Sequence, residues 1–574
     1  MTSDTPSGAS VDVVICGGGF AGLTLARQVQ REHPDLSVAV IDRLARPLPE
    51  GAFKVGESTV EMAAYYLRDV LGLAEYLDGA HLRKLGLRLF FPQPEGTTTF
   101  AERPEIGLSK FATVPSYQID RGRFEHDLRG LIEEDGARMI EGARLDEVEM
   151  GENGAPHRVF YYGDDSPERQ SLTARWVVDA SGRRRLLQRQ LNLGTQREAD
   201  HNAVWFRIEG LLDVDDLVPA ENRAWHDRVP DGKRRFSTNH LVDTGYWVWI
   251  IPLSSNKTSI GIVALKDMHP FDDFRNLERA QDWLRRKEPA FAEKLAQHEV
   301  LDFGAIRNYS HSSKQVFSAD RWACTGDAAV FADPLYSPGA DLIAFANCSI
   351  SWMIGEEIAG RLTPEVAEEK SRFVISMSEL LTRSIQVNYH IMGCPQAMGG
   401  KLFWDITAGW SVVQPLMFGK TFLDNAKRDA VRAASRNFFF LSLQMNQLFS
   451  DWAKQSRGHV GFEFIDYFVV DAIREMRDRN LVPDKPVEEL VADQQENMRL
   501  LEELAQALFR IAVADVHPEH AHKLEGKWLN AWAISLDPAK WDERGLFTPR
   551  SAPRDISRVS VPLNKAFRVR ELQH

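Results

Sequence analysis

The chain has 574 residues, 44% of them hydrophobic and 26% charged, which is enough for about three globular domains. Its 82 acidic residues outnumber its 69 basic residues, and the net charge of −13 argues against a general nucleic-acid or anionic-membrane binder. Four cysteines without a CxxC pair make a disulfide scaffold and a zinc finger unlikely. With no apolar run of about 18 residues and no signal-peptide pattern, we expect a cytoplasmic protein.

The first element is a predicted βαβ unit. Residues 11–16 form a β-branched run typical of a buried strand, and a glycine-rich turn, a helical pattern and a second strand ending in Asp42 follow. The turn carries a G-x-G-x-x-G pattern at Gly17, Gly19 and Gly22. Here the first glycine permits the turn, the second admits a pyrophosphate and the third lets helix and strand pack, while Asp42 would accept hydrogen bonds from a ribose. The sequence therefore predicts a dinucleotide site.

The middle and the end of the chain have different patterns. Strand patterns at 203–208, 246–253 and 259–265 indicate an antiparallel sheet inserted into the α/β domain. From about residue 350 apolar residues recur at three- and four-residue steps, which predicts a helical region. The helical stretches are expected at 355–385, 419–455 and 486–514.

Two later segments favour flavin over nicotinamide as the dinucleotide. VVDASG at 177–182 and TGDAA at 325–329 resemble the later signatures of FAD-dependent monooxygenases. In that family the aspartate of the Gly-Asp element meets the ribityl chain, and a following proline and glycine lie beside the flavin ring. The resemblance implies cofactor contacts for Gln118, Arg121, Asp179, Gly326, Asp327, Pro334 and Gly339. No second G-x-G-x-x-G follows a strand, so either NAD(P)H binds transiently or a separate reductase supplies reduced flavin.

Within that superfamily the chain resembles the flavin-dependent halogenases. KVGEST at 54–59 is similar to their Val-Gly-Glu-Ser/Ala element, and RKLGLRLF at 83–90 puts Lys84 in the place of the essential lysine. WVWIIP at 247–252 fits a Trp-x-Trp-x-Ile-Pro signature, and FADPLYSPG at 331–339 fits Phe-x-x-Pro-x-x-Ser-x-Gly. The resemblance covers about residues 11–350.

The resemblance implies chemistry at two separated places. Reduced FAD and O2 would oxidise chloride or bromide to hypohalous acid, which would travel to Lys84 and there meet an electron-rich aromatic carbon. A lysine suits this task because it is a donor when charged and a nucleophile when desolvated. Ser337 would act at the substrate end, Trp247 and Trp249 would keep organic substrate from the flavin, and Gly339 would face the halide.

Two positions depart from the family pattern. Tyr336 stands where tryptophan-specific members carry a glutamate, which favours phenolic, pyrrolic or carrier-tethered substrates. Pro338 has no N–H beside the expected halide and leaves Gly339 as the donor. Two alternatives therefore stay open: a flavin-dependent hydroxylase or oxidase on the same scaffold, and a flavin-binding protein without turnover.

We accordingly expect an α/β fold: an FAD-binding Rossmann-like βαβ domain, an inserted antiparallel-sheet substrate domain and a helical C-terminal region. The FAD-binding domain should comprise 11–85, 126–200 and 321–350, the substrate domain 86–125 and 201–320, and the helical region 351–574. The expected partners are a flavin reductase and a small aromatic substrate, free or bound to a carrier protein. No metal, nucleic acid or membrane is expected.

Overall fold

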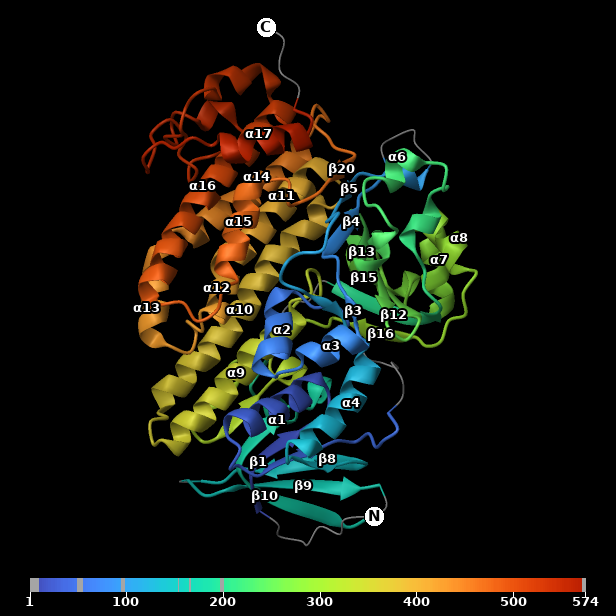
Figure 1. Ribbon diagram of the computed structural model, residues 1–574, viewed down its shortest axis with the longest axis vertical. Coiled ribbons are helices and arrows are strands. Elements are labelled where there is room, and N and C mark those ends of the chain that lie inside the picture. The colour runs from blue at the N-terminus through green and yellow to red at the C-terminus, as the bar shows by residue number, and fades with distance from the viewer. Residues whose placement is uncertain are drawn as a thin grey trace.

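The computed structural model describes residues 10–48, 55–93, 99–152, 154–164, 167–196 and 201–569 (Figure 1). A sheet with flanking helices forms the lower part of the view, a second sheet lies at the right, and helices fill the left side and the top. The predicted α/β fold class, with a helical C-terminal region, is confirmed.

The first sheet is built on the predicted βαβ unit. Its central strand β1 (Ser10–Cys16) pairs in parallel with β2 (Val38–Ile41) and with β10 (Arg169–Asp179), and α1 (Phe20–Glu32) connects β1 to β2. The strand order β18-β19-β10-β1-β2-β7 is completed by β18 (Phe317–Ser318), β19 (Trp322–Cys324) and β7 (Arg138–Ile140). The hairpin of β8 (Ala143–Glu149) and β9 (His157–Gly163) attaches to β10. The carboxyl ends of parallel strands meet at one edge, which is where such folds bind ligands.

The second sheet has the order β16-β12-β15-β14-β13-β4-β5-β20. Its expected strands are present and antiparallel: β12 (His201–Glu209), β14 (Tyr246–Leu253) and β15 (Lys257–Leu265). The others are β16 (Gly304–Arg307), β13 (Thr238–Asp243), β4 (Leu87–Phe90), β5 (Glu105–Ile106) and β20 (Phe464–Ile465). The edge strand β20 comes from the helical region and pairs in parallel with β5, so the C-terminal part of the chain completes this sheet.

Helices dominate the chain after residue 338. The long ones are α9 (Gly339–Ile358), α10 (Pro364–Ile391), α11 (Pro395–Ala408), α14 (Phe438–Gln455) and α16 (Val487–Val516). Shorter ones are α12 (Gln414–Phe418), α13 (Asn425–Ala434), α15 (Asp471–Asn480) and α17 (Ser557–Ala566). The stretch expected at 355–385 is split in two, because Thr363 caps the Val366 N–H and Pro364 begins a new helix. The stretch expected at 419–455 starts late and is divided between α13 and α14.

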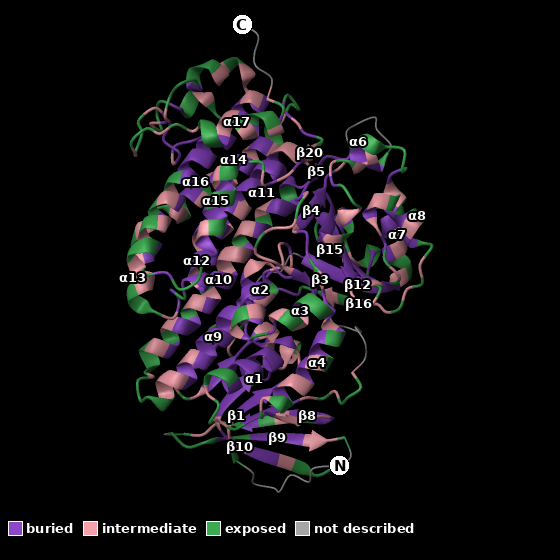
Figure 2. Cartoon of the chain, in the orientation of Figure 1, coloured by how far each residue is buried: buried purple, intermediate pink, exposed green. Residues whose placement is uncertain are grey.

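The helical region and the second sheet share one hydrophobic core. Trp247 of β14, Tyr389 of α10 and Leu504 of α16 belong to the same buried cluster. In Figure 2 buried residues, drawn in purple, are accordingly found both on the strands of this sheet and on the helices of the C-terminal region. Within the described ranges, no helix is long and apolar enough to cross a membrane, and no three His, Cys, Asp or Glu side chains are grouped to hold a metal ion.

Candidate active site

A cavity of about 330 Å³ lies where the two sheets meet α9. Its walls come from the glycine-rich turn after β1, from β14 of the second sheet and from the first turn of α9. Nine of the predicted site residues line it: Gly19, Arg121, Trp247, Trp249, Gly326, Asp327, Pro334, Ser337 and Gly339. Motifs far apart in the sequence therefore converge on one space.

Each glycine of the turn is required for a different structural reason. Gly17 has φ +129°, and a Cβ there would overlap the carbonyl oxygen of Ala180; a Cβ on Gly22 would overlap the carbonyl oxygen of Gly17. Gly19 is different, because a Cβ there would meet no protein atom within 4 Å. It caps α1 without a side-chain hydrogen bond, so the first N–H groups of the helix face the open space. This arrangement fits the pyrophosphate of a dinucleotide.

Asp42 lies at the end of β2, beside the glycine-rich turn. Its carboxylate accepts hydrogen bonds from the Gly18 N–H and, at 2.6 Å, from the Leu44 N–H. Its third partner is Arg129 of α4 (Arg121–Glu134), which lies 3.3 Å from the carboxylate and which no sequence motif predicts. Arg129 is fully buried and also donates to the Gly18 carbonyl oxygen at 3.2 Å. It therefore fixes the predicted ribose-binding carboxylate against the turn.

Two predicted cofactor residues lie behind the cavity wall. Asp179 ends β10 and accepts from the N–H groups of Ser181 at 2.9 Å and Leu187 at 2.8 Å. Gln118 is fully buried, and its amide donates to the Thr238 hydroxyl at 2.9 Å. Both side chains thus hold neighbouring segments in place, whereas Arg121 lines the cavity itself.

Lys84 is buried beside the cavity rather than in its wall. The strand β6 (Tyr117–Gln118) pairs with β3 (Leu82–Arg83) on one side and with residues 57–59 on the other. This pairing brings the Lys84 ammonium 2.7 Å from the Ser58 hydroxyl and 2.8 Å from the Thr59 carbonyl oxygen. The two motifs that the sequence supplied separately are therefore in contact, although Lys54 of the first motif lies outside the described residues.

Burial changes the acid–base behaviour of Lys84. The side chain is 3% exposed, and desolvation lowers its pKa from 10.5 to about 7. The acidic side chains of Glu61 and Asp341 oppose this lowering. A large fraction of the amine is consequently neutral near pH 7, as a nucleophilic lysine requires.

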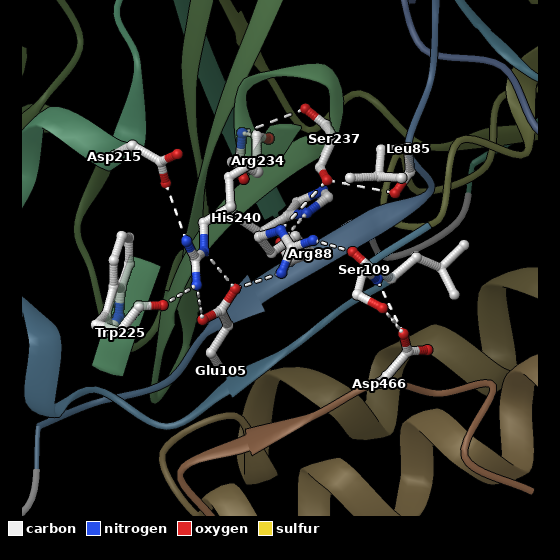
Figure 3. Close-up of polar contacts among 12 residues, drawn as sticks. Leu85, Arg88, Glu105, Ser109, Asp215, Trp225, Arg234, Ser237, His240 and Asp466 are labelled. Carbon is white, nitrogen blue, oxygen red and sulfur yellow. Dashed lines mark hydrogen bonds and ion pairs between the residues drawn. The ribbon is translucent and has the colours of Figure 1, made fainter. Parts of the chain in front are cut away.

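A buried ionic cluster lies in the second sheet, and its Arg88 is four residues along the chain from Lys84 (Figure 3). Glu105 of β5 is held between the guanidinium groups of Arg88 and Arg234, and all three side chains are fully buried. Asp215 binds the outer side of Arg234 at 3.1 Å. Two acids thus balance two bases, which buried charges require.

The cluster fixes the backbone that carries Lys84. Arg88 donates to the Ser237 hydroxyl at 3.2 Å, and that hydroxyl donates to the Leu85 carbonyl oxygen at 3.3 Å (Figure 3). The Lys84 N–H itself donates to Ser116 at 2.7 Å. The backbone on both sides of the Lys84–Leu85 peptide is therefore held by hydrogen bonds to neighbouring segments.

Ser337 lies in a strained turn that lines the cavity. Tyr336 and Ser337 have φ angles of +69° and +62°, in the left-handed region that residues other than glycine rarely occupy. The Tyr336 hydroxyl holds the turn, because it accepts from Asn388 at 2.9 Å and donates to Asp405 at 3.2 Å. The Tyr336 side chain is thus bonded to the helical region, and the residue does not line the cavity.

The same turn is anchored at its other end by Asp333. The Asp333 carboxylate accepts from the hydroxyls of Tyr309 at 2.8 Å and Tyr389 at 2.7 Å. Tyr389 in turn accepts from the Trp247 indole at 2.9 Å. One helix, α10, therefore touches both ends of the turn through its adjacent residues Asn388 and Tyr389.

Pro338 occupies the position just before α9. It is the N-cap residue of that helix, so its missing N–H is not one of the first-turn donors. Gly339 is the first helical residue, and a Cβ there would meet no protein atom within 4 Å. Room and free N–H groups for a small anion are thus present despite the proline.

The comparisons with known proteins agree with this geometry. The family model described as "FAD binding domain" matches residues 10–368. A flavin-dependent halogenase of Dictyostelium discoideum is 27% identical over 497 residues, which cover 79% of this chain and 78% of that protein. A 1H-pyrrole-2-carbonyl-[peptidyl-carrier protein] chlorinase of Pseudomonas fluorescens is 28% identical over 350 residues, covering 58% of this chain and 72% of that protein.

Solved structures show the same fold. The crystal structure of the halogenase PltM in complex with phloroglucinol and FAD superposes with a TM-score of 0.60 at 18% identity. It covers 86% of this chain and 96% of that chain, so the likeness includes much of the helical region.

Proposed function

This chain belongs to the FAD-binding domain family, and we propose that it is a flavin-dependent halogenase acting on an electron-rich aromatic substrate. The predicted cofactor, FAD, is confirmed by the family match. The observation that carries the halogenase assignment is Lys84: a buried amine with a pKa of about 7 that touches the wall of the flavin-binding cavity through Ser58.

FAD, when bound and reduced, supplies the reaction with O2 that oxidises a halide ion to hypohalous acid. The turn of Gly17, Gly19 and Gly22 with Asp42 would hold its ADP half, and Asp327 would hold the ribityl side. Trp247 and Trp249 line the cavity with their indole N–H groups bonded to Tyr389 and to Ser259. Because these bonds fix the rings, the pair keeps a bulky organic substrate from the flavin.

Lys84 performs the transfer to the substrate. The neutral amine attacks the halogen of hypohalous acid: an N–X bond forms, the O–X bond breaks, and the departing hydroxide leaves as water with one amine proton. The aromatic carbon then takes the halogen as the N–X bond breaks, and the proton that the ring loses is returned to the nitrogen, which restores the neutral amine. Two N–H bonds held by Ser58 and Thr59 are the starting point for this chemistry.

The halide would bind at the first turn of α9. Gly339 and the N–H groups after it offer donors, and Ser337 lines the same space. This geometry favours a halogenase over the hydroxylase alternative, because the main objection was the missing N–H of Pro338. That residue lies before the helix.

The substrate class and the partners are also proposals. Tyr336 is tied to Asn388 and Asp405, which favours a phenolic or pyrrolic substrate over free tryptophan. A carrier-bound pyrrole is supported by the chlorinase relative. The absence of a second dinucleotide motif from the sequence supports a flavin reductase as the source of reduced FAD.

The test is mass spectrometry of phenols and of free and carrier-bound pyrroles after incubation with FAD, reductase, NADH, O2 and bromide or chloride. Lys84→Ala should abolish halogenation and leave reoxidation of reduced flavin by O2 intact. Lys84→Arg should fail too, because a guanidinium stays charged. Without the reductase, NADH should reduce the bound flavin only slowly.

Retained FAD is the control for folding of both variants. Halogenated product from Lys84→Ala at near the wild-type rate would refute the proposal, and oxygenated product would favour the hydroxylase.

A further inference from the structure

We propose that Ser58 is a positioning residue for Lys84: its hydroxyl, backed by Thr238, orients the lysine amine so that the nitrogen lone pair is free to take the halogen. The inference rests on the proposed function, in which Lys84 attacks hypohalous acid. It adds a residue whose side chain touches both the lysine and the cavity.

Ser58 lies at the boundary between the two places of the reaction. It lines the cavity, and its hydroxyl is 2.7 Å from the Lys84 ammonium nitrogen and 2.8 Å from the Thr238 hydroxyl. Thr238 also lines the cavity and is bonded to the buried Gln118 amide at 2.9 Å. A line of hydrogen bonds therefore runs from Lys84 through two hydroxyls to Gln118.

The number of acceptors around Lys84 matches the neutral amine. An amine has two N–H bonds and one lone pair, and two acceptors surround the nitrogen: the Ser58 hydroxyl and the Thr59 carbonyl oxygen. With both N–H bonds directed at these acceptors, the lone pair points in the remaining direction. Because a lysine side chain rotates freely about its last bond, this direction is set only while both acceptors are present.

The Ser58 hydroxyl can accept a hydrogen bond from Lys84 because its own proton is directed to another acceptor. Since Ser58 accepts from Lys84, its O–H is free to donate to Thr238. The Gln118 amide restrains Thr238 in turn. Gln118, which resemblance alone put beside the flavin, therefore has a role through Thr238.

The charges around Lys84 set the direction of the pH effect. Glu61 from α2 (Glu61–Tyr65) favours the charged ammonium, and so does Asp341 from α9 once it is ionised, but burial raises the Asp341 pKa to about 8. His240 from β13 is neutral because burial lowers its pKa to about 4. A hydrogen-bond acceptor such as Ser58 stabilises an ammonium more than an amine. Removing it should lower the pKa of Lys84 further.

The experiment compares Ser58→Ala with Ser58→Thr, which keeps a hydroxyl, and with Thr238→Val. Ser378→Ala is the matched control, since Ser378 is buried in α10 and its hydroxyl has no partner within the described residues. Halogenation is followed against pH, together with hypohalous acid released to solution and flavin reoxidation by O2.

For Ser58→Ala we expect kcat for halogenation to fall about 10–100-fold. The acid limb of the pH profile should move down by about half a pH unit. More hypohalous acid should escape, with flavin reoxidation unchanged. Ser58→Thr should restore most of the rate, Thr238→Val should lose part of it, and Ser378→Ala should match the wild type.

A kcat for Ser58→Ala within twofold of the wild type, or an unmoved acid limb, would overturn the inference. If Ser58→Ala loses FAD, the inference is tested with Thr238→Val instead. A kcat of Thr238→Val within twofold of the wild type, or an unmoved acid limb, would then overturn it. The two possible failures can be told apart. If the proposed function is wrong, Lys84→Ala itself halogenates; if only the role of Ser58 is wrong, Lys84→Ala is inactive and Ser58→Ala has normal activity.

Discussion

Replacement of Lys84 by methionine should make the protein more stable to heat while abolishing halogenation. Methionine has a similar length and no charge, so it fills the same buried space. The lowering of the Lys84 pKa from 10.5 to about 7 corresponds to about 5 kcal/mol of unfavourable free energy for the charged form. Loss of the hydrogen bonds to Ser58 and Thr59 costs about 2–3 kcal/mol. The net gain at pH 6.5 is about 2 kcal/mol.

The gain must depend on pH in a defined direction. Between pH 7 and 10.5 the unfolded chain binds a proton at Lys84 that the folded protein does not, so wild-type stability rises with pH in this window. The penalty for the lysine is almost complete at pH 6.5 and falls to about 2 kcal/mol at pH 9. The advantage of the methionine variant should therefore be clear at pH 6.5 and absent near pH 9.

Differential scanning calorimetry at the two pH values, with FAD at the same saturating concentration, measures this difference. We expect the midpoint of Lys84→Met to lie a few degrees above that of the wild type at pH 6.5 and to coincide with it at pH 9. A variant less stable than the wild type at pH 6.5, or an equal gain at both pH values, would show that Lys84 is not held in an unfavourable charged state.

Two further predictions concern the cofactor turn and the turn of Ser337. Gly19→Val should fold normally but bind FAD far more weakly, because its side chain would fill the open space in which the pyrophosphate is expected. Gly22→Ala should instead lower the thermal midpoint of the apoprotein, because its Cβ would overlap the carbonyl oxygen of Gly17. FAD titration and thermal melting of both variants measure these two effects. Tyr336→Phe should raise the KM for halide several-fold with little change in FAD affinity, since it removes the hydrogen bonds to Asn388 and Asp405 that hold the strained turn; an unchanged halide KM would contradict this role.

The N-terminal fold and much of the site could be predicted because their signals are local. Gly17, Gly19, Gly22 and Asp42 lie within one βαβ unit, where spacing dictates the geometry. The strands of the second sheet have alternating apolar and polar residues or continuous apolar runs, and both patterns are long enough to be recognised. The lining of the cavity by Trp247 followed from a motif in the same way.

What could not be predicted depends on long-range pairing. The contact of Lys84 with Ser58 exists because β6, from a third part of the chain, pairs between their segments. Asn388 and Tyr389 belong to a helix whose apolar spacing indicates only a buried face, and nothing in that spacing says that they bind Tyr336 and Asp333. Arg129 is likewise an ordinary helical arginine until the fold places it beside Asp42.

The pairing of β20 with β5 has a consequence for synthesis of the protein. Phe464 leaves the ribosome about 360 residues after Ile106, so β5 waits about 20–70 s for its neighbour at 5–20 residues per second. During this interval β5 is an open sheet edge, and such edges pair readily with other chains. Glu105 carries a charge in that edge, and its ion pairs with Arg88 and Arg234 form only when β4 and the segment before β13 are in place. The nascent chain is therefore exposed to aggregation at this edge until residues 464–465 have emerged, and chaperone dependence should concentrate in that interval.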